Sequence, residues 1–167
     1  MVMHDALSDV SNILWRERQL LELLVFKLEE EQLVLASGRT RWLQHATREV
    51  ETVLGEIKRM ELDRGVHVEG LAGELGANVS PSLRQLGELA PKPWDKIFQE
   101  HRRALMDLTT EIQDVAKANR EILTRGQVAT REALASLGDT ELDRYTPAGN
   151  VVGDRGLSGR RLIDEAM

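Results

Sequence analysis

The chain has 167 residues, no cysteine and a formal net charge of −6. The absence of cysteine excludes disulfides, thiol catalysis and cysteine-ligated zinc, and it is compatible with a reducing compartment. The acidic balance disfavours nucleic acid as a partner, because binding to phosphates needs a clustered basic face. No apolar run approaches the length of a membrane span, and no secretory signal is visible at the N-terminus, so we expect no membrane insertion.

The composition predicts an all-α protein. Leu, Glu, Arg and Ala dominate and aromatic residues are scarce, which favours helices over a β-sandwich. We expect an antiparallel helical bundle or coiled coil of three long helices with short connecting helices. Residues 1–145 would form one helical domain, and the glycine-rich residues 146–167 a flexible C-terminal tail.

The first long helix is predicted over residues 5–37, with Gly38 as its C-terminal stop. Its main apolar stripe repeats with a heptad spacing at Leu7, Leu14, Leu21, Leu28 and Leu35. A second set of large apolar residues lies off that stripe, at Trp15, Leu23, Phe26 and Leu33. This helix is therefore either central to the assembly or exposed to a partner.

The second long helix is predicted over residues 40–64. Only three residues, 37–39, separate the two apolar patterns, so the two segments form either an αα-hairpin or one helix kinked at Gly38. The hairpin is favoured, because an unbroken helix of about 60 residues would leave its stripe uncovered in a monomer.

Glycine and proline punctuate residues 65–93, where we expect two short helices, 68–76 and 81–89. Ser80 and Pro81 are predicted to supply the N-cap and first position of the second short helix.

The third long helix is predicted to open near Pro93, to pass Gly126 and to end at Gly138. Its stripe alternates steps of four and three, and its members are Trp94, Phe98, His101, Leu105, Leu108, Ile112, Val115, Asn119 and Ile122. We expect His101 to be a partly exposed, hydrogen-bonded helix histidine rather than a ligand or pH switch. Asn119 is either a residue where the stripe fades, or a polar residue that fixes register or contacts an incoming helix.

The apolar register shifts after Ile122. The next apolar positions fall on a stripe rotated by one residue, at Leu123, Thr130, Leu134 and Leu137. We therefore expect the end of this helix to turn a different face outward.

The residues needed for catalysis are absent or scattered. The four histidines are widely spaced, none is preceded by glutamate three residues earlier, and the tail glycines match no nucleotide-binding loop. We expect no catalytic residue, no metal and no cofactor.

The order of several segments resembles the FlgN family of flagellar export chaperones over roughly residues 7–150. The segments that carry the resemblance are the Leu-rich LLELLVFKLEEEQLVLASGRTRWL, the short SLRQLGEL, NREIL at 119–123 and Tyr145 with Gly149 in YTPAG. Ile122 stands where leucine is commoner in the family, and no role carries over to the tail beyond Gly149.

The resemblance implies a non-catalytic cytoplasmic chaperone. It would hold hook-filament junction subunits of the FlgK and FlgL type, mask their terminal helices and bring them to the export gate protein FlhA. The last helix is associated with cargo, and the candidate residues there are Asn119, Leu123, Val128, Leu134 and Leu137. The region after it is associated with gate docking, with Tyr145 and Gly149 as candidates.

Several other interpretations stay open. The late leucines could close only the bundle's own core, and Tyr145 could pack back onto the last helical turn. The chain could instead be a coiled-coil adaptor or structural protein that forms a homodimer through its stripes. A metal-dependent helical-bundle enzyme is the third class.

Overall fold

The computed structural model describes residues 2–77 and 79–144, with side chains up to residue 138. Over these residues it contains four α-helices, one 3₁₀ turn and no strand, which confirms the all-α fold. The elements are α1 (Val2–Ala36), η1 (Thr40–Trp42), α2 (Leu43–Ala72), α3 (Leu83–Leu89) and α4 (Trp94–Arg144). The chain divides into two compact units, Met1–Arg125 and Gly126–Met167.

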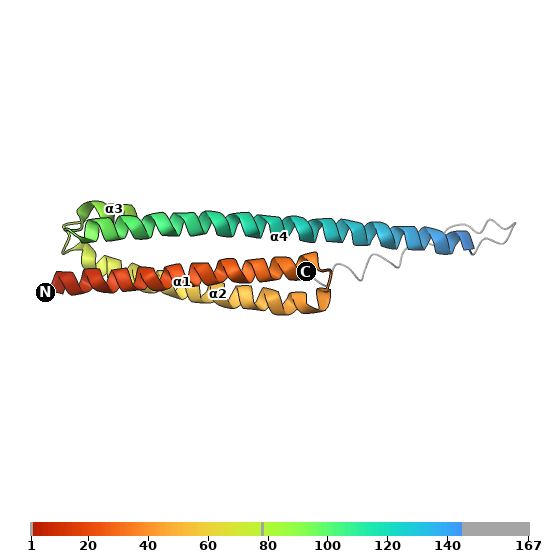
Figure 1. The fold of residues 1–167 in the computed structure, drawn as a ribbon, viewed down its shortest axis with the longest axis horizontal. Helices are drawn as coiled ribbons and strands as arrows, with labels where there is room; N and C mark the ends of the chain where they lie inside the picture. The colour runs from red at the N-terminus through yellow and green to blue at the C-terminus, as the bar shows by residue number, and fades with distance from the viewer. Residues whose placement is uncertain (1, 78, 145–167) are drawn as a thin grey trace. The chain divides into compact units, whose positions relative to one another are not determined.

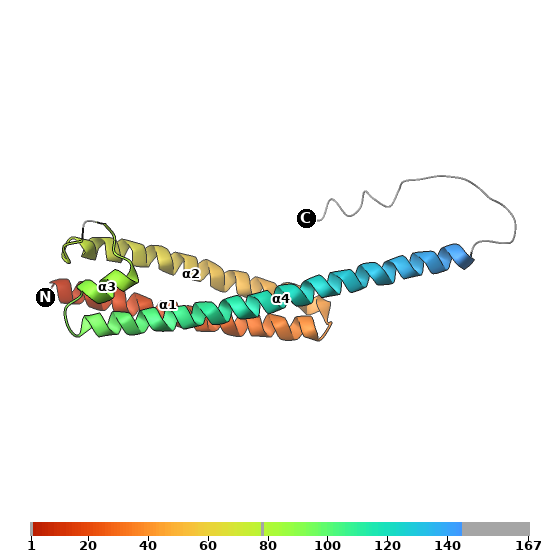
Figure 2. The same cartoon turned by 90° about the horizontal axis from the view of Figure 1, so that it is seen from above.

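The first unit is a helical bundle in which α1, α2 and the first part of α4 run side by side, with α3 beside the start of α4 (Figure 1). α2 runs antiparallel to α1, whereas α4 runs in the same direction as α1 (Figure 2). Two contacts along the α1–α4 pair fix that direction, Ser11 with His101 and Leu28 with Asn119. No described helix is both long and apolar enough to cross a membrane.

The core of the first unit consists of two apolar clusters. The one where all four α-helices meet contains Leu7, Val10, Leu14, Val68, Leu71, Leu86, Ala90 and Phe98. The other lies further along the bundle between α1 and α2, contains Leu24, Leu28, Val50, Val53 and Ile57, and is covered by residues of α4. The heptad stripes predicted from the sequence therefore face one another inside the first unit.

The turn between α1 and α2 is a hairpin rather than a kink. α1 ends at Ala36, and Gly38 adopts a positive φ of 69° while its N–H donates to the Leu35 carbonyl. That left-handed conformation costs glycine little, because it has no Cβ. The predicted stop at Gly38 is confirmed.

The predicted short helix over residues 68–76 is wrong as a separate element, because α2 continues to Ala72. Gly65 and Gly70 remain helical, since Val68 and Leu71 between and beyond them are buried in the core. α2 ends at Ala72, and the turn that follows closes at Gly76, with φ 70°, where the Ala77 N–H donates to the Ala72 carbonyl at 2.9 Å. Packing of the α2 face outweighs the low helix propensity of its glycines.

The predicted cap of α3 by Ser80 and Pro81 is also wrong. The N-cap is Ser82, whose Oγ accepts from the Gln85 N–H at 3.3 Å, while Gln85 Oε1 accepts from the Ser82 N–H at 2.8 Å. This reciprocal capping box satisfies two backbone donors. A cap formed by Ser80 and Pro81 would not provide this pair of hydrogen bonds.

α4 does not end at Gly138 but continues to Arg144. A glycine within a helix costs about 1 kcal/mol relative to alanine, which is not enough to end α4 at Gly138. Gly126 also lies within the helix, as predicted.

Candidate functional site

The inward face of α4 carries the apolar stripe predicted for residues 94–122. Phe98 is fully buried, and Trp94 and Leu105 pack against the same cluster. Further along, Ile112 and Val115 pack against the α1–α2 cluster. The early and middle parts of α4 therefore bury their apolar face in the protein's own core.

His101 is a core residue, and the prediction of partial exposure is wrong. Its ring is 1% exposed, lies 3.1 Å from Ser11 Oγ through Nε2, and packs edge-on against Trp15 with centroids 5.1 Å apart. The sequence placed His101 on the stripe correctly, but a serine on α1 was needed to give the buried ring a hydrogen-bond partner at Nε2. Such a partner cannot be recognised before the two helices are aligned.

Burial, together with the positive charge of Arg18, lowers the pKa of His101 from its usual 6.5 to about 4. Glu100 acts in the opposite direction but is outweighed. The imidazole is therefore neutral at physiological pH, and its role in the bundle is a neutral hydrogen bond to Ser11.

Asn119 is also buried, and its amide bridges to α1. Its Nδ2 donates to the Leu28 carbonyl at 2.9 Å and to Glu31 Oε1 at 3.1 Å. Of the alternatives left open by the sequence, the structure supports the polar residue that fixes register, because the contact is to α1 of the same chain. Two donated bonds at one position set the register of α4 along α1.

A buried ion pair joins α1 to α2. Glu17 is buried within the heptad spacing of α1, and both its carboxylate oxygens accept from Arg64 Nη1 at 2.7 Å. Burial raises the pKa of Glu17 above its usual 4.5, the nearby charge of Glu61 adds to that, and Arg64 opposes both.

Four of the predicted cargo residues are exposed. Leu123 lies near the end of the first unit, and Val128, Leu134 and Leu137 lie in the second. Leu134 and Leu137 are 64% and 65% exposed and, three residues apart, share one helix face. Val128 is six residues before Leu134, about 120° away around the helix, so it points to another side.

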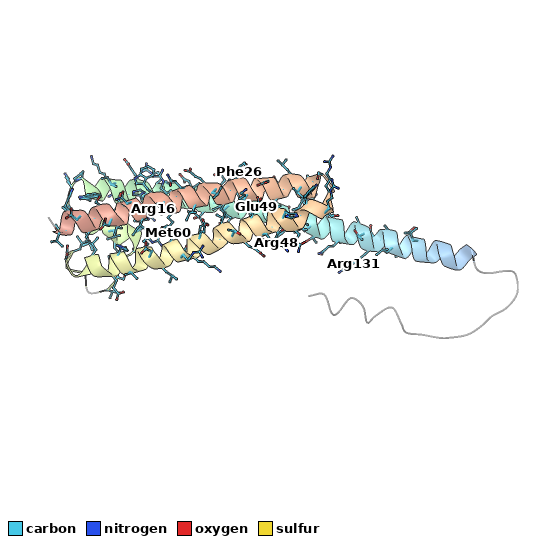
Figure 3. All side chains as sticks on the ribbon, turned by 90° about the horizontal axis from the view of Figure 1, so that it is seen from below. Arg16, Phe26, Arg48, Glu49, Met60 and Arg131 are labelled. Atoms are coloured by element: carbon cyan, nitrogen blue, oxygen red, sulfur yellow. The ribbon has the colours of Figure 1, made fainter. Side chains whose placement is uncertain are left out.

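The first unit has exposed apolar residues as well. Trp15, Leu23, Phe26 and Leu33, which lie off the main stripe of α1, are all exposed. Leu23 also lines an open groove between α1 and α2, with Arg16 and Leu20 from α1 and Met60 and Arg59 from α2. Figure 3 shows Arg16 and Phe26 on α1 and Met60 on α2.

A comparison with protein families matches residues 1–153 to the family described as FlgN protein. The chain belongs to the FlgN family. No curated protein and no solved structure matches it. FlgN proteins are flagellar export chaperones and not an enzyme family, and the exposed leucines of α4 are consistent with a chaperone that presents apolar surface.

Two predicted site residues of this FlgN chain, Tyr145 and Gly149, lie outside the described residues, although the family match includes them. The described residues contain no group of three or more histidine or acidic side chains placed to hold a metal ion.

Sequence reasoning missed two polar features of this FlgN protein, the partnership of Ser11 with His101 and the ion pair of Glu17 with Arg64. A signal was available for the second, because Glu17 interrupts an otherwise apolar set of heptad positions on α1. Its partner on α2 depends on the register of the hairpin, which a single sequence does not specify.

Proposed function

We propose that this chain holds hook-filament junction subunits of the FlgK and FlgL type in the cytoplasm, masks their terminal helices and delivers them to the export gate. The observation that carries the proposal is the exposure of Leu134 and Leu137 on one face of α4. Helical cargo with an uncovered apolar stripe can be covered by helix-in-groove packing against such a face.

The early and late parts of α4 differ in side-chain exposure, which supports separate roles in the protein's own core and in cargo binding. Phe98 and His101 are sealed against α1, whereas Leu134 and Leu137 stand about two-thirds exposed. Covering two leucines releases roughly 1.5–3 kcal/mol each when burial is complete, which favours a guest helix that does so. We propose Leu123 as a further contact of this surface and Val128 as a cargo contact on another side of the helix, with the buried Asn119 at the edge of the surface.

We propose further that Tyr145 and Gly149 dock on FlhA. The support is the resemblance of YTPAG to the Tyr-x-x-x-Gly motif. A tyrosine ring offers large contact area at low entropic cost, which suits a docking anchor.

The cargo proposal is tested by calorimetric titration with a junction subunit, with and without its terminal helices. The double variant Leu134→Asp/Leu137→Asp should weaken binding at least about tenfold, since each charge would face an apolar stripe. Leu62→Asp is the control, because Leu62 on α2 is also a largely exposed leucine, at 73%. Equal affinity of the double variant and the control would reject the proposed surface, as would undiminished binding of a subunit that lacks its terminal helices.

The gate proposal is tested with Tyr145→Ala in a titration against the cytoplasmic part of FlhA. Helicity and cargo affinity should stay at the wild-type values while gate affinity falls, and Tyr145→Phe should retain most of it if the ring supplies the contact. An unchanged gate affinity for Tyr145→Ala would exclude the docking role.

A further inference from the structure

The outward face of α4 within the first unit carries basic side chains and an exposed methionine. Met106 is 53% exposed and, at about 100° per residue, lies about 140° around the helix from the buried His101 and Asn119. Between residues 99 and 120, four exposed cations lie within roughly 60° of Met106 around the helix. They are Arg102, Arg103, Lys117 and Arg120. Met106 and these four cations form the outer α4 stripe.

The acidic side chains of the same segment lie on a different side of α4. The carboxylates between residues 99 and 120 are about 80–140° from Met106, and they are Glu100, Asp107, Glu111 and Asp114. No cation of the stripe has an ion-pair partner among the residues whose side chains the structure describes. The positive charges of this segment are therefore gathered on one face, in a chain whose formal net charge is −6.

The N-terminal part of the outer α4 stripe borders two grooves where α3 lies beside α4 (Figure 1). The grooves have volumes of about 420 and 340 Å³, and Arg102 and Met106 line both of them, so they adjoin. Leu83 of α3 and Leu105 of α4 line the smaller groove, which gives it an apolar floor. A ligand that follows the stripe would therefore meet an apolar hollow next to unpaired arginines.

The larger groove has an excess of positive charge. It is lined by three arginines, Arg84, Arg102 and Arg103, and by two carboxylates, Glu88 and Asp107. Arg84 pairs with Glu88 at 3.2 Å. The remaining charges are two cations and one carboxylate, which favours an acidic ligand.

These features fit an acidic amphipathic helix better than a nucleic acid. A helix is about 10–12 Å across, so it can follow the stripe without covering the carboxylates on the side of α4. It can also seat an apolar side chain on Met106. A phosphate backbone is negative along its whole length, so it would leave Met106 and Leu83 against charge and would approach Asp107.

We propose that the outer α4 stripe binds an acidic amphipathic helix of a partner protein. An apolar side chain of that helix occupies the groove at Met106. Carboxylates at one end of the helix pair with Arg102 and Arg103, and carboxylates roughly 20 Å further along pair with Lys117 and Arg120. The site lies in the first unit, so it is separate from the cargo surface proposed at the end of α4.

Calorimetric titration of the full chain with synthetic peptides tests this site. The probe is a helical peptide of about 20 residues, which spans the roughly 27 Å of the stripe, with glutamates in its first and last turns and leucines on one face between them. A second peptide has every glutamate replaced by glutamine. The wild type should bind the acidic peptide at least about tenfold more tightly than the glutamine peptide, and added salt should reduce the difference. Equal affinities for the two peptides would overturn the proposal.

Charge reversal locates the binding site. Arg102→Glu/Arg103→Glu should weaken binding of the acidic peptide at least about tenfold. The matched control is Lys58→Glu/Arg59→Glu, which reverses two adjacent exposed cations on α2, changes the net charge by the same amount and should bind as the wild type does. Equal affinities of the two double variants would show that the peptide responds to overall charge alone, and would overturn the assignment.

Three further measurements separate an amphipathic helix from other ligands. Met106→Ser should weaken binding of the acidic peptide by about threefold or more, because it removes apolar contact, and an unchanged affinity would contradict the proposed seat. Single-stranded DNA or phosphatidylserine vesicles that bind through Arg102 and Arg103 more tightly than the peptide does would overturn a protein partner. Junction-subunit affinity should be the same for the wild type and Arg102→Glu/Arg103→Glu, and its loss would assign the stripe to cargo instead.

Discussion

Acidification acts on the bundle through the buried imidazole of His101. The pKa of about 4 in the folded chain lies below the usual 6.5 expected after unfolding. As the pH falls through 6.5, His101 therefore binds a proton in the unfolded chain but not in the folded chain. The stability contributed by the neutral ring is complete above pH 6.5, declines between 6.5 and 4, and is lost below 4.

The size of this loss follows from the two pKa values. A gap from 6.5 to about 4 corresponds to roughly 3 kcal/mol in total, at about 1.4 kcal/mol for each tenfold change in proton affinity. Between about pH 7.5 and pH 5 the wild type should lose about 2 kcal/mol of unfolding free energy through this residue. The physical causes are burial of the ring and the nearby Arg18, whose positive charge opposes protonation.

The measurement is urea unfolding followed by far-UV circular dichroism at those two pH values, for the wild type and His101→Gln. Glutamine does not titrate, and its amide can still bond to Ser11. Glu17 shifts stability the other way, since its raised pKa favours the protonated folded state on acidification. That contribution is shared by both proteins and cancels in the comparison. If the two proteins lose the same free energy between the two pH values, the account of His101 given above is wrong.

Three further substitutions test the packing of the first unit by the same unfolding assay. Asn119→Asp should cost about 2 kcal/mol at neutral pH and more than Asn119→Ala, because it replaces the donor to Leu28 and sets a second carboxylate against Glu31; the opposite order would contradict the assigned bonds. Arg64→Leu should cost about 2 kcal/mol and recover stability on acidification, since it leaves the Glu17 carboxylate buried and unpaired; a loss independent of pH would argue against that pairing. Leu105→Asp should cost about 3 kcal/mol or more, because it places a charge against the core; a neutral effect would remove Leu105 from the packed face.

The late part of α4 shows how far an apolar pattern can be interpreted. The register shift after Ile122 predicted a change of face, and Leu134 and Leu137 are exposed in the structure. Val128 is also a predicted cargo residue, although its position on the helix points it to another side. Whether an exposed residue binds cargo depends on a second molecule, so it stays a prediction.

The errors in the sequence analysis have a common cause. Glycine and proline predicted ends of helices at positions where packing or a cap decided otherwise, as at Gly65 within α2 and at Ser82 before α3. Intrinsic preferences of about 1 kcal/mol per residue are smaller than the free energy of burying a neighbouring apolar side chain. Local preference therefore predicted where a helix is weak, but not where it stops.

The sequence by itself determined the helical class, the hairpin stop at Gly38 and the apolar stripes, because heptad spacing and a left-handed glycine are local properties of the chain. Only the tertiary structure decided which polar residues the stripes enclose. His101 needed Ser11, Asn119 needed the Leu28 carbonyl, and Glu17 needed Arg64. Each of these partners lies on a different helix, and the free energy of a buried polar group is set by the partner it meets after the helices have packed.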